Sequence, residues 1–122
     1  MRNKPVLLVE DDEHTMFTMK DMLDVLGVGY EAAVNGKNCI ERLMQNPNKY
    51  GTILLDVQMP EMDGLEVVSY IRRLTEDPPR NIRIIAVTAD MRFHSPEVAR
   101  EAGFDEVVAK PVRLEKIREM VA

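Results

Sequence analysis

Five polar side chains are the residues of this sequence best suited to chemistry, because each stands at or directly after the end of a short apolar run. They are Glu10, Asp11, Asp56, Thr88 and Lys110. Crowded carboxylates repel one another unless a cation or protons compensate them. A cluster with only oxygen ligands suits a hard ion such as Mg²⁺, whereas zinc would favour His or Cys. A magnesium site is therefore expected if the three acids meet.

The same five residues are suited to phosphoryl transfer. With a metal ion and the Lys110 ammonium offsetting the acids, an anionic phosphoryl group can approach, and the Thr88 hydroxyl can bind its oxygens. Asp56 then becomes a carboxylate nucleophile, and aspartyl-phosphate is a known type of covalent intermediate. A nucleophile at the end of a buried strand is also held in position by a rigid element.

These side chains can meet only if the strands that precede them are neighbours. Apolar runs predict strands at 5–9, 29–34, 52–56, 82–88 and 105–109. Helical spacing and stop signals predict helices from Glu13 to Gly27, from Gly36 to near Pro47, and over 65–74, 96–103 and 113–121. This strand–helix alternation, with nearly continuous Val, Ile and Leu in three strands, predicts an α/β, doubly wound parallel sheet of five strands with helices on both faces. Ligands of such sheets bind at the carboxyl ends of the strands.

Length and charge narrow the classes of function. The chain has 122 residues, enough for one domain over 1–122, and its net charge of −5 argues against direct binding of nucleic acid. No apolar run approaches the roughly 18 residues of a membrane span, and no signal peptide is evident, so we expect a cytoplasmic protein without membrane contact. Cys39 is expected in the core, and His14 and His94, which lack ligand-spaced partners, at the surface.

Four motifs in order along the chain resemble the receiver domains of two-component response regulators. They read LLVEDDE (7–13), LLDVQMPEMDG (54–64), AVTAD (86–90) and VVAKPV (107–112). The resemblance covers essentially the whole chain and implies the flavodoxin-like (βα)5 fold. It also implies a phosphorelay receiver that accepts a phosphoryl group from a phosphohistidine and then changes a partner-binding surface.

Carried over by motif position, the resemblance implies a role for each candidate residue. Asp56 would be the phosphoacceptor, Asp11 a direct Mg²⁺ ligand, and Glu10 a ligand acting largely through water. The backbone carbonyl of Gln58 would complete the metal site. Thr88 would bind the phosphoryl oxygens and Lys110 would pair with the acyl phosphate. Pro111 is the residue that usually follows this lysine, often through a cis peptide bond.

The resemblance also implies partners. These are a sensor histidine kinase or a histidine phosphotransfer protein upstream and a protein target downstream, with the receiver a monomer or weak dimer. We interpret it as a self-phosphorylating and slowly self-dephosphorylating module rather than a dedicated enzyme. It reads as a stand-alone regulator, although a piece of a larger kinase or regulator would look the same.

Two alternatives and several structural readings remain beside this hypothesis. A Mg²⁺-dependent phosphohydrolase would also form an aspartyl-phosphate, but it needs a second acid two residues after the nucleophile, where Gln58 stands. A binding-only receiver with a vestigial site is disfavoured because all five candidate residues are present. Asp12 or Glu13 is expected only to cap the first helix, and the Met59-Pro60 and Asp63-Gly64 pairs to form turns.

Two positions depart from the usual receiver pattern. Many receivers carry Tyr or Phe, as a rotating switch, three residues before the lysine, and Val107 stands there. Valine is short and stiff at χ1, so any switching movement is expected in the segment 89–95, where Met91 and Phe93 can repack. Asp90 adds an acid close to the expected phosphoryl group, with a net effect that residue type alone does not define.

Overall fold

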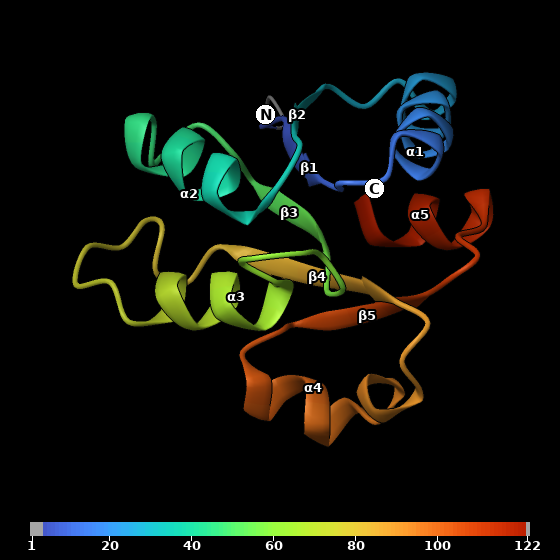
Figure 1. Cartoon of the computed structure of the whole chain (residues 1–122). Coiled ribbons are helices and arrows are strands. Elements are labelled where there is room, and N and C mark those ends of the chain that lie inside the picture. Colours follow the sequence, from blue (N-terminus) through green and yellow to red (C-terminus); the bar gives the residue numbers. More distant parts are fainter. Residues whose placement is uncertain (1–3, 122) are drawn as a thin grey trace.

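A five-stranded parallel sheet forms the centre of the computed structural model, which describes residues 4–121 (Figure 1). The strands lie in the order β2-β1-β3-β4-β5. Their bounds are β1 Val6–Val9, β2 Tyr30–Ala33, β3 Thr52–Asp56, β4 Arg83–Thr88 and β5 Glu106–Ala109. Because β1 and β3 are adjacent in the middle of the sheet, the chain reverses its winding direction beside them.

Helices cover both faces of the sheet (Figure 1). Their bounds are α1 Glu13–Leu26, α2 Gly36–Gln45, α3 Gly64–Arg72, α4 Pro96–Ala102 and α5 Leu114–Val121. The alternation of side chains along each strand divides the core, since Leu7 and Val9 face α2, α3 and α4 whereas Val6 and Leu8 face α1 and α5. Within the described residues, no helix combines the length and apolar character needed to cross a membrane.

Local sequence signals account for the helix ends. Asp12 caps α1 by accepting a hydrogen bond from the Thr15 N–H, and Gly27 ends that helix in the left-handed region at φ 71°. Asp63 and Glu66 form a reciprocal capping box at the start of α3. The capping role expected of Asp12 is therefore confirmed.

The doubly wound five-stranded fold expected from the sequence is confirmed, with differences at a few element ends. Helix α3 ends at Arg72, two residues before the expected Leu74, because the backbone N–H groups of Arg73 and Leu74 bond back in tighter turns. A short 3-10 turn, η1 (Met91–His94), precedes α4 and was not expected. The ends of the expected domain, residues 1–3 and 122, lie outside the described residues.

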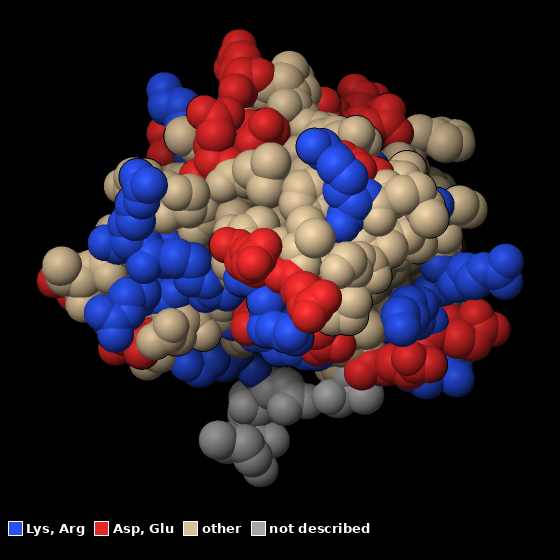
Figure 2. Space-filling view, turned by 90° about the horizontal axis from the view of Figure 1, so that it is seen from below, with Lys and Arg blue, Asp and Glu red and all other residues tan. Residues whose placement is uncertain are grey.

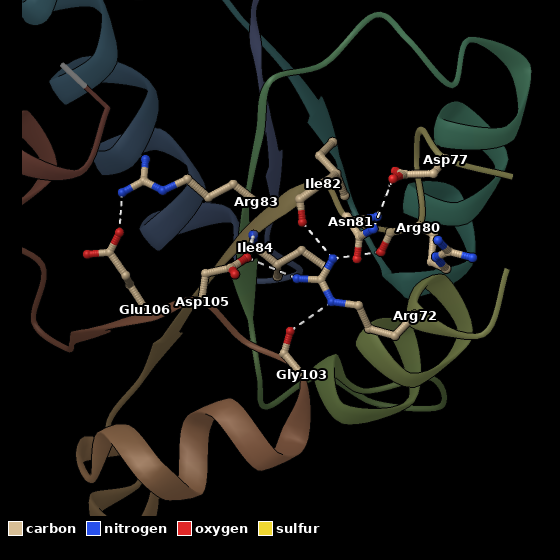
Figure 3. Close-up of polar contacts among 10 residues, drawn as sticks. All are labelled: Arg72, Asp77, Arg80, Asn81, Ile82, Arg83, Ile84, Gly103, Asp105 and Glu106. Carbon is tan, nitrogen blue, oxygen red and sulfur yellow. Dashed lines mark hydrogen bonds and ion pairs between the residues drawn. The ribbon is translucent and has the colours of Figure 1, made fainter. Parts of the chain in front are cut away.

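At the amino-terminal edge of the sheet, the Arg72 guanidinium joins α3 to the starts of β4 and β5 (Figure 3). It donates to the carbonyl oxygens of Gly103, Arg80 and Ile82 at 2.9, 2.8 and 2.7 Å, and to the Asp105 carboxylate at 2.9 Å. Asp105 also accepts from the Ile84 N–H at 2.8 Å. This Arg72 cluster satisfies backbone carbonyls that would otherwise lack partners at the edge of the fold.

Replacing Arg72 by Met should lower the free energy of unfolding by about 2 kcal/mol, because three carbonyls and one carboxylate lose a charged donor. Urea unfolding followed by circular dichroism measures the change. Arg73→Met is the matched control, since that exposed side chain forms no hydrogen bond or ion pair with the described residues. An equal loss of stability in both variants would contradict the structural role of the Arg72 cluster.

Candidate functional site

Strand register brings the ends of four strands to one edge of the sheet. Val9 pairs with Leu55, so Glu10, the next residue after β1, lies beside Asp56. Asp56 pairs with Val87, next to Thr88, and Thr88 pairs with Ala109, next to Lys110. The structure therefore brings together residues that are separated by as many as 100 positions in the chain.

Three carboxylates form a compact acidic cluster at this edge. One oxygen from each of Glu10, Asp11 and Asp56 lies within 4.8 Å of the others. Glu10 and Asp56 are each only 2% exposed, whereas Asp11 is open to solvent. One side of the cluster is thus accessible to an ion while the other is held within the protein.

Lys110 supplies the cation that faces this cluster. Its Nζ donates to Asp56 Oδ1 at 3.1 Å and lies 3.5 Å from Glu10 Oε1. Burial opposes the charge of Lys110, but attraction to Asp56 and then Glu10 outweighs it and raises the pKa of the ammonium. Lys110 therefore stays charged and holds the position next to Asp56. It is joined to Pro111 by a cis peptide bond.

Glu10 is the most perturbed acid of the site. Burial, followed by the neighbouring Asp56 carboxylate, raises the pKa of Glu10 from 4.5 to about 8, against the opposing effects of the Asp12 N–H and Lys110. Glu10 Oε2 accepts from Asp12 N at 3.1 Å, but Oε1 is buried without a hydrogen-bond partner among the described residues. A buried acceptor of this kind fits a bound cation or its water.

The backbone at Gln58 and at Gly64 contacts Asp56 and helps to fix its position. Gln58 N–H donates to Asp56 Oδ1 at 3.2 Å. Gly64, at the start of α3, approaches so closely that a Cβ there would lie 2.8 Å from the Asp56 carbonyl oxygen and 2.7 Å from Val57 Cα. The glycine expected only to form a turn also allows α3 to begin directly against the Asp56 strand end.

Thr88 is fully buried at the end of β4, and its hydroxyl accepts from the Asp90 N–H at 2.9 Å. The Asp90 side chain does not join the acidic cluster. It caps η1 and forms an ion pair with Arg92 at 2.5 Å, which lowers the pKa of Asp90. The extra acid noted in the sequence is therefore compensated locally by Arg92, a partner that sequence analysis did not identify.

Taken together, the geometry offers a buried carboxylate with an ammonium in contact and an adjacent set of carboxylate oxygens. The donor set fits Mg²⁺, because it consists of carboxylate oxygens, one of which is buried and forms no hydrogen bond with the described residues. The individual roles assigned to Glu10, Asp11, Asp56, Gln58, Thr88 and Lys110 remain predictions.

Comparison with known families gives the same family that the four sequence motifs resemble. Residues 6–122 match the model of the response regulator receiver domain. The sensor protein ArcB of Escherichia coli, named for aerobic respiration control, is 35% identical over 118 residues, which cover 95% of this chain and 14% of ArcB. The polar-differentiation response regulator DivK of Brucella anthropi is 32% identical over 119 residues, covering 97% of this chain and 93% of DivK.

A solved structure adds a comparison of the site. The receiver domain of sensor histidine kinase PA1611 from Pseudomonas aeruginosa superposes with a TM-score of 0.79 at 26% identity, covering 98% of this chain and 95% of that one. That structure has a magnesium ion coordinated in its active-site cleft. Several of the relatives are much longer, since this chain spans 7% to 15% of the histidine kinases and sensor proteins that it matches.

The expected division between metal ligand and helix cap can be tested at two adjacent acids. Asp11→Asn should weaken Mg²⁺ binding about tenfold or more, because a charged oxygen of the cluster is lost. Asp12→Asn should change it little, since Asn caps a helix as well as Asp does. Titration of amide shifts with Mg²⁺ measures both affinities. Equal losses in the two variants would refute the distinction.

The raised pKa of Glu10 predicts a pH dependence of stability in the metal-free protein. A carboxyl that is protonated in the folded state up to about pH 8, but ionises near 4.5 when unfolded, stabilises the fold fully below 4.5 and progressively less up to 8. In EDTA, the free energy of unfolding should therefore fall between pH 5 and pH 8, by at most about 1.4 kcal/mol per pH unit.

Urea unfolding across this pH range is the measurement. Glu10→Gln, which stays neutral, should flatten the slope. An unchanged slope in that variant would show that other groups cause it.

Proposed function

The chain belongs to the family of response regulator receiver domains, and on that basis we propose that it accepts a phosphoryl group on Asp56 in a Mg²⁺-dependent reaction. The observation that carries the proposal is the Asp56 carboxylate, 2% exposed, at the end of a central strand with Lys110 Nζ 3.1 Å away. A buried acid held against a cation at a strand end is a costly arrangement for a structural residue and a useful one for a nucleophile.

In the proposed reaction an Asp56 carboxylate oxygen attacks the phosphorus of a phosphohistidine. The bond from phosphorus to the histidine nitrogen breaks, its electron pair stays on the imidazole, and an acyl phosphate forms. Lys110 pairs with the new negative charge, and the Thr88 hydroxyl donates to a phosphoryl oxygen. A Mg²⁺ ion held by Glu10, Asp11, Asp56 and the Gln58 carbonyl would supply positive charge to offset the phosphoryl oxygens.

The phosphohistidine would come from a sensor histidine kinase or a histidine phosphotransfer protein. A surface beside the site supports this proposal, because α1 and the segment after β5 enclose a cavity of about 440 Å³. It is lined mainly by apolar or small side chains, among them Met19, Ala89 and Val112, and by Lys110 itself. An apolar surface next to the nucleophile suits a partner that must bring its histidine to Asp56.

We further propose a cytoplasmic signalling module that acts on a downstream protein as a monomer or weak dimer and that is not a dedicated enzyme. The net charge of −5 argues against a nucleic-acid surface. Figure 2 shows Lys and Arg on both sides and in the middle of the face that carries α4, interspersed there with Asp and Glu. The phosphohydrolase alternative lacks the second acid that it requires, because position 58 is Gln.

Asp56→Asn should abolish phosphorylation and leave the fold intact, because the amide is nearly isosteric with the carboxylate and removes one buried negative charge. Intact mass after incubation with acetyl phosphate and Mg²⁺ should show one phosphoryl adduct in the unmodified chain and none in the variant. Asp63→Asn serves as a control, since that acid caps α3 and lies outside the acidic cluster. An adduct that persists in Asp56→Asn would overturn the assignment.

A further inference from the structure

Val107, at the position where many receivers carry an aromatic residue, lies beside a hollow between β5, α5 and the start of α4. A cavity of about 240 Å³ lies there. Its lining includes apolar groups such as Val107 and Phe93 and charged groups such as Asp105, Glu106 and Lys116. A cavity with this mixed lining can accept a ring that also carries a polar atom, because buried polar atoms need partners.

His94, the last residue of η1, stands at this cavity and at the candidate site together. His94 lines the cavity, the residue is exposed, and its Nε2 lies 3.4 Å from the backbone oxygen of Thr88. Two aromatic residues line the cavity among the described residues, His94 and Phe93. Phe93 is only 5% exposed and packs edge-on against Phe104. Phe93, which the sequence led us to expect as a group that could repack, is therefore already fixed in the core, whereas His94 is exposed.

The turn that carries His94 is attached directly to Thr88. Asp90 N–H donates to the Thr88 hydroxyl at 2.9 Å, and Phe93 N–H donates to the Asp90 carbonyl at 3.2 Å. Ser95 follows at once as the cap of α4. A displacement of the Thr88 hydroxyl therefore changes the hydrogen bond that holds the start of η1, and η1 leads without a linker into α4.

The opposite end of α4 is fixed. The Gly103 carbonyl, directly after α4, accepts from Arg72 at 2.9 Å, and the Phe104 N–H donates to Ala99. The Phe104 ring is 1% exposed. One end of the helix is thus held by the Arg72 cluster and the other is connected to the candidate site through η1.

We propose that His94 is the positioning residue that couples Thr88 to α4, in place of an aromatic on β5. This inference rests on the proposed function. When the Thr88 hydroxyl moves to bond a phosphoryl oxygen, it weakens its bond from the Asp90 N–H, and the His94 ring leaves the Thr88 carbonyl and moves from the lining of the cavity beside Val107 into its interior. The amino-terminal end of α4 moves with it, while the end at Gly103 stays in place.

Beryllofluoride with Mg²⁺, a mimic of the phosphoryl group, tests the proposal through backbone amide shifts. In the unmodified chain we expect shifts at Asp56, Gln58 and Lys110, and also over 89–98, with Gly103 to Asp105 nearly silent. His94→Ala should reduce the shifts over 95–98 at least about twofold and leave those at Asp56 and Lys110 unchanged. His94→Tyr, which keeps a ring with a polar tip, should retain them.

Met91→Ala is the matched control, because Met91 lies in the same turn, is 74% exposed and does not line the cavity. It should retain the shifts over 95–98. The inference is overturned if His94→Ala keeps these shifts, if Met91→Ala or His94→Tyr loses them equally, or if Gly103 to Asp105 shift as much as 95–98. Absence of any shift at Asp56 and Lys110 in the unmodified chain would instead reject the proposed function, and this inference with it.

Discussion

Two carboxylates buried side by side, with one ammonium to offset them, set the requirements that the rest of the structure meets. Glu10 and Asp56 are each 2% exposed, and Lys110 lies 3.1 Å from one and 3.5 Å from the other. Two acids against one base leave the site short of positive charge, so a proton on Glu10 or an added cation restores the balance. One charge deficit thus underlies both the raised pKa of Glu10 and the fit of the site to a cation.

The fold maintains this unfavourable arrangement by fixing its members on rigid elements. Parallel register places the ends of β1, β3, β4 and β5 at one edge, and apolar cores on both faces keep the strands from adjusting. The repulsion between buried carboxylates is concentrated at that edge. The opposite edge carries the hydrogen bonds from Arg72 to backbone carbonyls. The satisfied polar contacts and the unfavourable concentration of charge therefore lie at opposite ends of the same strands.

The sequence predicted what depends on periodicity and on strand ends. Apolar runs located all five strands, and the carboxyl-end rule placed Asp56 near Lys110 although 54 residues separate them. It did not predict contacts that depend on side-chain direction within irregular turns, because no periodicity applies there. The Asp90–Arg92 pair, the approach of His94 to Thr88 and the four acceptors of Arg72 all belong to this class.

The Arg72 cluster also implies that some segments of the domain open locally less readily than others. The amides of Ile84 and Asp105 are tied into it, one through the Asp105 carboxylate and the other through the Ile84 carbonyl. Hydrogen exchange at these two amides then requires the α3, β4 and β5 segments to separate together, whereas the exposed turn at Met91 and Arg92 can exchange by local fluctuation. We therefore expect slow exchange at the start of β4 and faster exchange in the turn that follows its end, six strand residues away.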